Sequence, residues 1–357
     1  MEKRVLVTGA GGVGGVNFIR ALRAAGDFFI VGLDHDEFYI QAPDVDARLR
    51  SPRHDDPFFI PFVEEAVRKF GIEFIHPQPE VELEVLSEAG PPIAGAEMVV
   101  PRPEVVKVAR DKWRTYLVLS KWSVRVPETK LYSEEAVQEL LDRHGRVWLR
   151  ARKGAGGKLS LPVDSVEEAK RWVELWVLKG RARPEDFIVQ EYLPGRDIAW
   201  DSLWFRGELV ASYTRERLRY IFPHISPSRI TGTPTVARTI RDPEVNRVAE
   251  EAVRAIDDEP HGFYCVDIRC DKDGRPAITE VNVKAHTTLG LWSYVAQKAL
   301  GLPREYNMPY LYVMLGLGEE VELPPEPYDI YPEAFMLRHI DVGLLVNTGD
   351  GWRKVPI

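Results

Sequence analysis

The stretch that decides the fold is GFYCVDIRCDKDGRPAITEVNVK, residues 262–284. Two alternating runs flank DKDG, which is typical of a tight turn, so the stretch predicts an antiparallel β-hairpin. An even turn that pairs Cys270 with Arg275 sets Cys265 opposite Glu280. In that register one face of the hairpin is apolar, with Val266, Ile268, Val281 and Val283. The other face is polar, with Asp267, Glu280, Asn282 and Lys284. An odd turn would break this argument.

The polar face is a candidate metal site. Carboxylates and an amide oxygen on adjacent strands suit Mg²⁺ that is bound together with phosphate groups. The alternative is a solvated outer face, which is common in antiparallel hairpins.

Two further segments carry candidate chemistry. In LRARKGAGGKLSL, residues 149–161, three glycines follow three bases, so backbone N–H groups and positive charge could meet phosphates. It is not a P-loop, and the alternative is a flexible turn between two strands. In VQEYLPGRDIAWD, residues 189–201, an apolar strand ends at Gln190 and Glu191, and a Pro-Gly turn leads to Asp197.

Taken together, in their order along the chain, the three segments resemble those of the ATP-grasp superfamily, most closely the carbamoyl-phosphate-synthetase-like carboxylate–amine ligases. The resemblance covers about residues 1–300. The resemblance implies a fold of α/β and α+β parts. A Rossmann-like pre-ATP-grasp domain would span 1–108, a linker helix and lid subdomain 109–186, and a C-terminal subdomain with the metal hairpin 187–357.

The resemblance also assigns residues. It implies an ATP site made of Lys112, Arg150, Arg152, Gly154, Gly156, Gly157, Gln190, Glu191, Leu193 and Asp197. It implies one or two Mg²⁺ ions, with Mn²⁺ as an alternative, on Asp267, Glu280 and Asn282. The lysine and arginines would contact phosphates, the glycines would close over them, residues 190–193 would read adenine, and Asp197 would hold the ribose.

The chain departs from the family pattern at Lys284, where relatives carry arginine in an N-P-R motif. Lysine keeps the charge but loses the planar fork of arginine. The glycine-rich loop also lacks a further glycine that is usual after the GG pair. Both departures bear on the details of the reaction.

The segment YTRERLRY places Arg215, Arg217 and Arg219 at alternate positions, so on a strand they share a face. In the family such bases meet the γ-phosphate or the carboxylate substrate. We therefore expect catalytic roles for Lys284, Arg217 and Arg215, against the alternative of a solvated strand face. Weaker candidates in the substrate pocket are His224, Arg229 and His286.

The opening VLVTGAGGVGGVNFIRALRAAG, residues 5–26, fits a dinucleotide fingerprint through Gly9, Gly11 and Gly14, with Asp34 at the expected distance. It favours a rival interpretation, a nicotinamide-dependent reductase or epimerase. Against this, the strands at 4–8, 28–34, 72–77 and 97–100 predict a sheet of only about four strands. The resemblance implies that these glycines serve a tight turn instead.

Composition narrows the function classes. The net charge of −8 argues against a nucleic-acid partner. No apolar run reaches the length of a membrane span, and no export signal opens the chain. Cys265 and Cys270 lie on one predicted strand about 17 Å apart, too far for a disulfide, so we expect two buried thiols. These observations favour a cytoplasmic protein.

The sequence thus predicts an ATP- and Mg-dependent ligase that activates a carboxylate as an acyl phosphate for attack by an amine or a similar nucleophile. Its partners would be small-molecule carboxylate and amine substrates, with a homodimer as the family-level expectation. A non-catalytic ATP-binding module and a carbamoyl-phosphate-type reaction are the alternatives within the same fold. The sequence does not identify the substrates.

Overall fold

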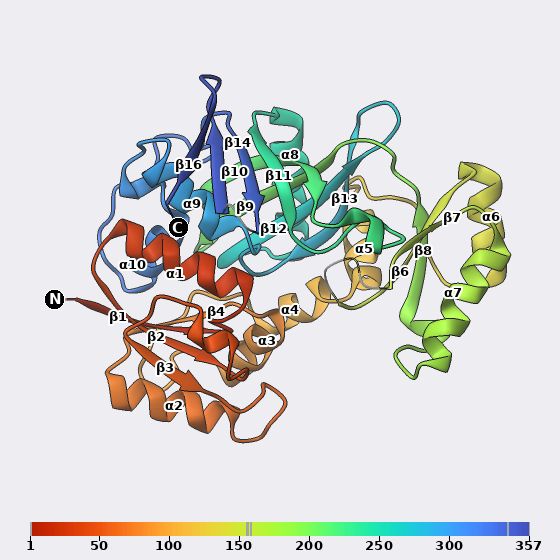
Figure 1. Cartoon of the computed structure of the whole chain (residues 1–357). Helices are drawn as coiled ribbons and strands as arrows, with labels where there is room; N and C mark the ends of the chain where they lie inside the picture. The colour runs from red at the N-terminus through yellow and green to blue at the C-terminus, as the bar shows by residue number, and fades with distance from the viewer. Residues whose placement is uncertain (1, 155–156, 158, 341–342, 357) are drawn as a thin grey trace.

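The computed structural model describes residues 2–154, 157, 159–340 and 343–356, which form three sheets and the helices that cover them (Figure 1). The first sheet is parallel, with strand order β3-β2-β1-β4. Its elements are β1 (Lys3–Thr8), α1 (Val13–Ala25), β2 (Phe28–Asp34), β3 (Ala47–Arg50), α2 (Phe59–Phe70), β4 (Phe74–Pro77), α3 (Glu80–Ala89) and α4 (Pro103–Ala109). The expected alternation of strands and helices is therefore present.

Two details of this sheet differ from the sequence prediction. Residues 97–100 do not form a strand: Met98, Val99 and Val100 are buried and apolar, and the exposed Glu97 makes a single bridge to Phe74. The fourth strand is instead β3, whose sequence ARLR alternates between half-buried and exposed positions. An edge strand with two arginines gives no apolar signal, which explains why the pattern missed it.

The second sheet is small and antiparallel, with strand order β5-β8-β6-β7. Helix α5 (Lys112–Lys121) leads into it, and its elements are β5 (Thr129–Leu131), α6 (Glu134–His144), β6 (Val147–Ala151), β7 (Leu161–Val163), α7 (Val166–Leu178) and β8 (Phe187–Glu191). Ser133 and Ser165 cap α6 and α7, because each hydroxyl accepts a hydrogen bond from the first turn. Strand β8 belongs to this sheet although it follows residue 186, so the domain limit there stays a proposal.

The third sheet is the large antiparallel one, with strand order β13-β12-β9-β10-β11-β14-β15-β16. Its elements are β9 (Asp197–Phe205), β10 (Glu208–Tyr220), β11 (Pro234–Ile240), α8 (Pro243–Ile256), β12 (Gly262–Cys270), β13 (Pro276–Asn282), α9 (Leu289–Lys298), α10 (Met308–Gly316), β14 (Phe335–His339), β15 (Gly343–Asn347) and β16 (Trp352–Val355).

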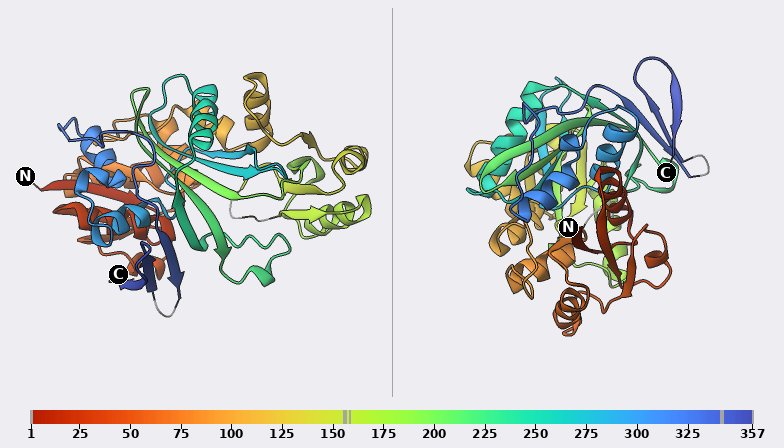
Figure 2. Two further views of the ribbon diagram at one scale, coloured as in Figure 1. Left: turned by 90° about the horizontal axis from the view of Figure 1, so that it is seen from above. Right: turned by 90° about the vertical axis from the view of Figure 1, so that its left-hand side faces the viewer.

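Helices cover both faces of the large sheet (Figure 2). Helices α4, α5 and α8 pack on one face, and α1, α9 and α10 share a core with the other. Strand β12 shows the division: Val266 and Ile268 belong to the first core, whereas Cys265 belongs to the second. Both cysteines are buried and free, as expected. No helix of the described residues is long and apolar enough to cross a membrane.

The register of the β12–β13 hairpin differs from the prediction. Cys270 pairs with Pro276 rather than Arg275, so the turn holds an odd number of residues. A bulge follows at Thr279, and beyond it Asp267 pairs with Glu280 and Cys265 with Asn282. The bulge restores the parity that the odd turn had broken. The predicted faces are therefore correct, although the pairs Cys265–Glu280 and Asp267–Ile278 are wrong.

Candidate active site

A cavity of about 670 Å³ lies between the small sheet and the large sheet. The small sheet contributes Trp148, Arg150, Pro162 and Gln190. The large sheet contributes Asp197, Arg215, Arg217, Tyr220, Asp267, Arg269, Glu280 and Asn282. A segment after β10, from Pro227 to Pro234, forms another wall. Most of the residues predicted from the sequence to form a site thus meet in one place.

The bulge in the hairpin sets the two candidate metal-binding carboxylates directly opposite each other. Asp267 forms an ion pair with Arg217 and accepts a hydrogen bond of 3.3 Å from the amide nitrogen of Asn282. Glu280 forms ion pairs with Lys112 at 3.1 Å and with Arg150 at 2.7 Å. Cations from three other elements therefore hold both carboxylates at the cavity floor.

These cations keep the carboxylates charged. Burial raises the pKa of Asp267, but the charge of Arg217 outweighs it and lowers that pKa to about 2. Burial likewise opposes ionisation of Glu280, and the charges of Lys112 and Arg150 outweigh it, so its pKa is lowered. Two negative oxygen donors are thus available on neighbouring strands.

The expected adenine and ribose residues lie along β8 and the start of β9. Gln190 lines the cavity and donates from its amide to the Thr129 hydroxyl at 2.9 Å. Glu191 and Leu193 also line the cavity. Asp197 has three partners in this structure, namely Arg217 at 3.2 Å, Arg269 at 3.0 Å and the hydroxyl of Tyr220 at 2.8 Å.

Among its described residues, the glycine-rich loop lies close to the rest of the site at two points. The Lys112 ammonium donates to the Gly154 carbonyl at 2.7 Å. Gly157 has a φ of +71°, and a Cβ there would lie 3.1 Å from Ile230. This contact joins the loop to the segment after β10. Gly156 lies outside the described residues.

Arg152 differs from the expectation of a phosphate contact. Its guanidinium forms an ion pair with Asp111 at 2.6 Å, and it is not among the residues that line the cavity. Asp111 is buried and caps α5 by accepting from the Trp113 backbone. The observed contacts of Arg152 are therefore with the start of the linker helix.

The three arginines of β10 do not share one face. A bulge between Arg217 and Tyr220 leaves Arg219 exposed and turns Tyr220 into the cavity in its place. Arg215 is only 1% exposed and pairs with Asp201 at 2.8 Å. Of the remaining candidates, Lys284, Arg229 and His286 line the cavity, whereas His224 is exposed and does not.

Asp201 is the functional candidate that the sequence reasoning missed. It is completely buried and contacts both Arg215 and His286. It comes four residues after Asp197 on β9, so alternation alone places both carboxylates on one face. Its position within an apolar run, IAWDSLW, marks it as a buried charge that requires a partner.

Comparison with known proteins identifies the fold. The sequence model of the ATP-grasp domain matches residues 109–288, half of the chain. The chain belongs to the ATP-grasp family. Its structure resembles that of L-amino acid ligase from Bacillus licheniformis, with a TM-score of 0.66 and 16% sequence identity over 94% of this chain and 80% of that one.

Two further solved structures are similar. One is the biotin carboxylase domain dimer of 2-oxoglutarate carboxylase from Hydrogenobacter thermophilus, in complex with MgADP, ADP and bicarbonate. Its TM-score is 0.66, at 18% identity over 95% of this chain and 74% of that one. The other is carboxyaminoimidazole ribonucleotide synthase from Aspergillus clavatus complexed with ATP. Its TM-score is 0.65, at 14% identity over 94% of this chain and 82% of that one. At these identities the likeness establishes the shared fold.

Proposed function

We propose that this ATP-grasp protein is an ATP- and Mg²⁺-dependent ligase that activates a carboxylate as an acyl phosphate and joins it to an amine. The observation that carries the proposal is the pair Asp267 and Glu280, set face to face and charged at the floor of the cavity. A decayed, non-catalytic module has no reason to keep both carboxylates and the cations that hold them.

The cavity also fits an anionic ligand. Among the described residues, Nη1 of Arg215 and the hydroxyl of Thr288 are buried polar atoms without a hydrogen-bond partner. Both side chains belong to residues that line the cavity. An unpaired buried donor costs free energy, and a bound phosphate or carboxylate oxygen would recover that cost. The donor set thus suits a nucleotide phosphate chain and an acidic substrate.

In this proposal Asp267, Glu280 and Asn282 hold the metal ion. Bound Mg²⁺ would neutralise phosphate charge and orient the γ-phosphate for attack. Lys112 and Arg150 would offset charge on the transferred phosphoryl group. Lys284 would lie on the side of that group from which the substrate carboxylate attacks. Glu191 and Leu193 would bind adenine, and Asp197 would take the ribose hydroxyls.

The reaction then needs mainly positioning by the chain. A substrate carboxylate oxygen attacks the γ-phosphorus, the bond from phosphorus to the ADP oxygen breaks, and ADP leaves. Arg215 and Arg217 would align that carboxylate. The amine next attacks the acyl carbon, phosphate departs with the bonding electrons, and the phosphate takes up the proton that the amine nitrogen loses. Closure of the glycine-rich loop would exclude water from the acyl phosphate.

The rival dinucleotide function meets a steric obstacle. The backbone N–H of Gly11 already donates to Asp34 at 2.9 Å. A Cβ at Gly11 would lie 2.4 Å from the backbone of Tyr39, and one at Gly14 would lie 2.5 Å from the Gln78 amide. The glycines therefore permit close packing over the first turn, where a pyrophosphate would otherwise lie.

A thermal-shift comparison of the purified protein tests the proposal. Mg·ATP at 100 times its Kd should add about 2.7 kcal/mol of stability, less without Mg²⁺, while NADH and NADPH should add none. Phosphate release with panels of carboxylates and amines then identifies the substrates, with Glu280→Gln as the inactive control. Stabilisation by NADH or NADPH and not by Mg·ATP would overturn the proposal.

A further inference from the structure

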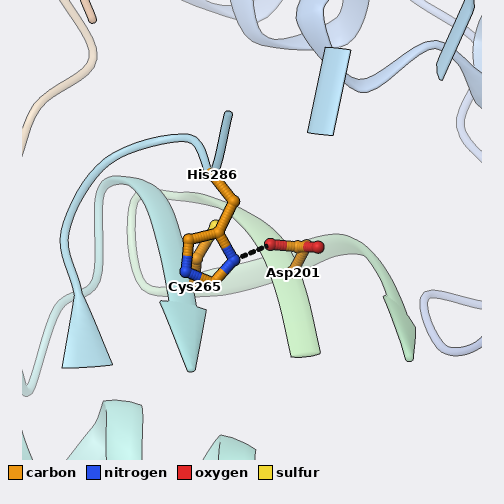
Figure 3. Close-up of side chains that lie close together, drawn as sticks. All are labelled: Asp201, Cys265 and His286. Carbon is orange, nitrogen blue, oxygen red and sulfur yellow. Dashed lines mark ion pairs between the residues drawn. The ribbon is translucent and has the colours of Figure 1, made fainter. Parts of the chain in front are cut away.

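His286 lies beside the candidate metal ligands and is held by a buried carboxylate. Figure 3 shows its imidazole pointing at Asp201, with Cys265 next to both. The distance from Nδ1 of His286 to Oδ1 of Asp201 is 2.5 Å. The side chain of His286 is 10% exposed and that of Asp201 is 0% exposed. The contact is therefore sheltered from solvent.

The short contact fixes which ring nitrogen carries a proton. A carboxylate oxygen offers no proton, so at this distance the proton of the neutral His286 ring is on Nδ1, the nitrogen that faces Asp201. Nη2 of Arg215 lies farther from the same nitrogen, at 3.2 Å, and this arginine makes its main bond to Asp201 through Nε. With the proton on Nδ1, the lone pair is on Nε2 and points away from Asp201.

Nε2 of His286 faces the metal hairpin. It lies 3.6 Å from Oδ1 of Asp267 and 3.2 Å from the amide nitrogen of Asn282, which donates to it. Two donor atoms of one ion lie roughly 3 Å apart, because each is about 2.1 Å from the metal. Rotation of the Asn282 side-chain amide by half a turn places its oxygen, instead of its nitrogen, next to Nε2 of His286. The three side chains can therefore share one ion.

The group Asp201, Cys265 and His286 offers another arrangement, in which an ion binds among these three residues. Two observations oppose it. At 2.5 Å, the Asp201 and His286 atoms lie closer together than the roughly 3 Å that separates two ligands of one ion. Asp201 is also already paired with Arg215. These three residues are better described as a group that orients the His286 ring, so that its Nε2 faces the metal hairpin.

We propose that His286 is a direct ligand of the metal ion in this chain, through Nε2, with Asp201 orienting the ring. This inference rests on the proposed function, because it adds a donor to the same metal site. A histidine held by a carboxylate through its other nitrogen is the usual arrangement around protein-bound metals.

The donor set predicts which ion the site prefers. Mg²⁺ favours oxygen ligands, whereas an imidazole nitrogen strengthens binding of transition ions such as Mn²⁺. The site of this chain therefore favours Mn²⁺ over Mg²⁺ more strongly than an all-oxygen site would. Replacing His286 by asparagine should lower the affinity for Mn²⁺ by about tenfold or more, since loss of a ligand costs at least as much as loss of a group that orients one, and the preference for Mn²⁺ should fall with it.

Electron paramagnetic resonance of Mn²⁺ bound to the full chain with ADP tests the inference without turnover. Wild-type protein labelled with ¹⁵N-histidine should show direct coupling of Mn²⁺ to a histidine nitrogen. His286→Asn should lose that coupling, whereas His35→Asn, at an exposed histidine of the N-terminal domain, and Cys265→Ala should keep it. The amplitude of the free Mn²⁺ signal, with Mg²⁺ as competitor, measures the preference.

The outcomes separate the two proposals. Absence of Mn²⁺·ADP binding to wild-type protein would overturn the proposed function and this inference together. Binding without histidine coupling, or with coupling that survives in His286→Asn, would overturn the inference alone. Coupling lost in Cys265→Ala as well would place the ion among Asp201, Cys265 and His286 instead. If His286→Asn does not fold, the coupling in labelled wild-type protein decides.

Discussion

The buried ion pair between Arg215 and Asp201 makes a strong prediction for stability. The two side chains are 1% and 0% exposed and lie 2.8 Å apart. Burial opposes ionisation of Asp201, but the charge of Arg215 and the close contacts with Arg215 and His286 outweigh it, so the pKa of Asp201 is well below its usual range. Replacing Arg215 by methionine removes a main partner of a charge without access to water. Breaking such a pair costs about 3–5 kcal/mol.

A double-mutant cycle isolates the pair. Arg215→Met combined with Asp201→Asn removes both charges, while the asparagine oxygen still accepts from His286. We expect the double variant to be more stable than the sum of the two single losses predicts, by about 1–3 kcal/mol. Arg247→Met is the matched control, because Arg247 pairs with Glu251 on the surface, where the loss should be about 0–1 kcal/mol.

The assay is urea unfolding followed by tryptophan fluorescence. Trp200, Trp204 and Trp292 are fully buried in the cores on the two faces of the large sheet, so they report unfolding of the domain that holds the pair. A loss below about 1 kcal/mol in Arg215→Met, equal to the control, would refute the reasoning, because exposed ion pairs behave in that way.

Three further predictions follow from the site and its surroundings. Glu280→Gln should reduce Mg·ATP-dependent phosphate release by about 100-fold or more, and normal turnover would refute the metal assignment. Arg152→Met should lower the free energy of unfolding by about 1–3 kcal/mol, because Asp111 loses a charged hydrogen bond. Isothermal titration should show an unchanged Kd for Mg·ATP. A weaker Kd would indicate that Arg152 contacts the phosphates. Burial lowers the pKa of His76, which stacks on Phe18, to about 3. Below about pH 6.5 the unfolded chain therefore binds a proton that the folded protein excludes, and stability falls by about 1.4 kcal/mol per pH unit. Urea unfolding at pH 6, 5 and 4 should show a shallower fall for His76→Leu, and identical slopes would contradict this.

The predicted faces of the β12–β13 hairpin are correct because they depend on the alternation of each strand and not on the exact residue pairs. Burial of Val266 and Val281 against α8 requires one parity, and that parity places Asp267 and Glu280 on the opposite face. Hydrophobic alternation records this parity but not the length of the turn. The bulge at Thr279 changes the register without exchanging the faces. The candidate site residues therefore share one face although the predicted residue pairs are wrong.

Other features depend on contacts that no local pattern records. The bulge after Arg217 exposes Arg219 and brings Tyr220 into the cavity, and nothing in YTRERLRY distinguishes it from a regular strand. The side chain of Arg152 pairs with Asp111, a partner 41 residues away in the sequence. His286 gains its orientation from Asp201, which lies on a different strand of the large sheet.

The charges of the cavity explain how such a site can be stable before a nucleotide arrives. Arg217 neutralises Asp267, and Lys112 with Arg150 neutralises Glu280. In the proposed function, a metal–nucleotide complex would bring a cation for the carboxylates and phosphate oxygens for the three bases. Binding would therefore exchange partners on both sides and leave no buried charge unpaired at the end. Metal alone would supply a new partner only for the carboxylates, and nucleotide alone only for the bases. In this proposal, the pairs that hold the hairpin in place favour joint binding of the two ligands.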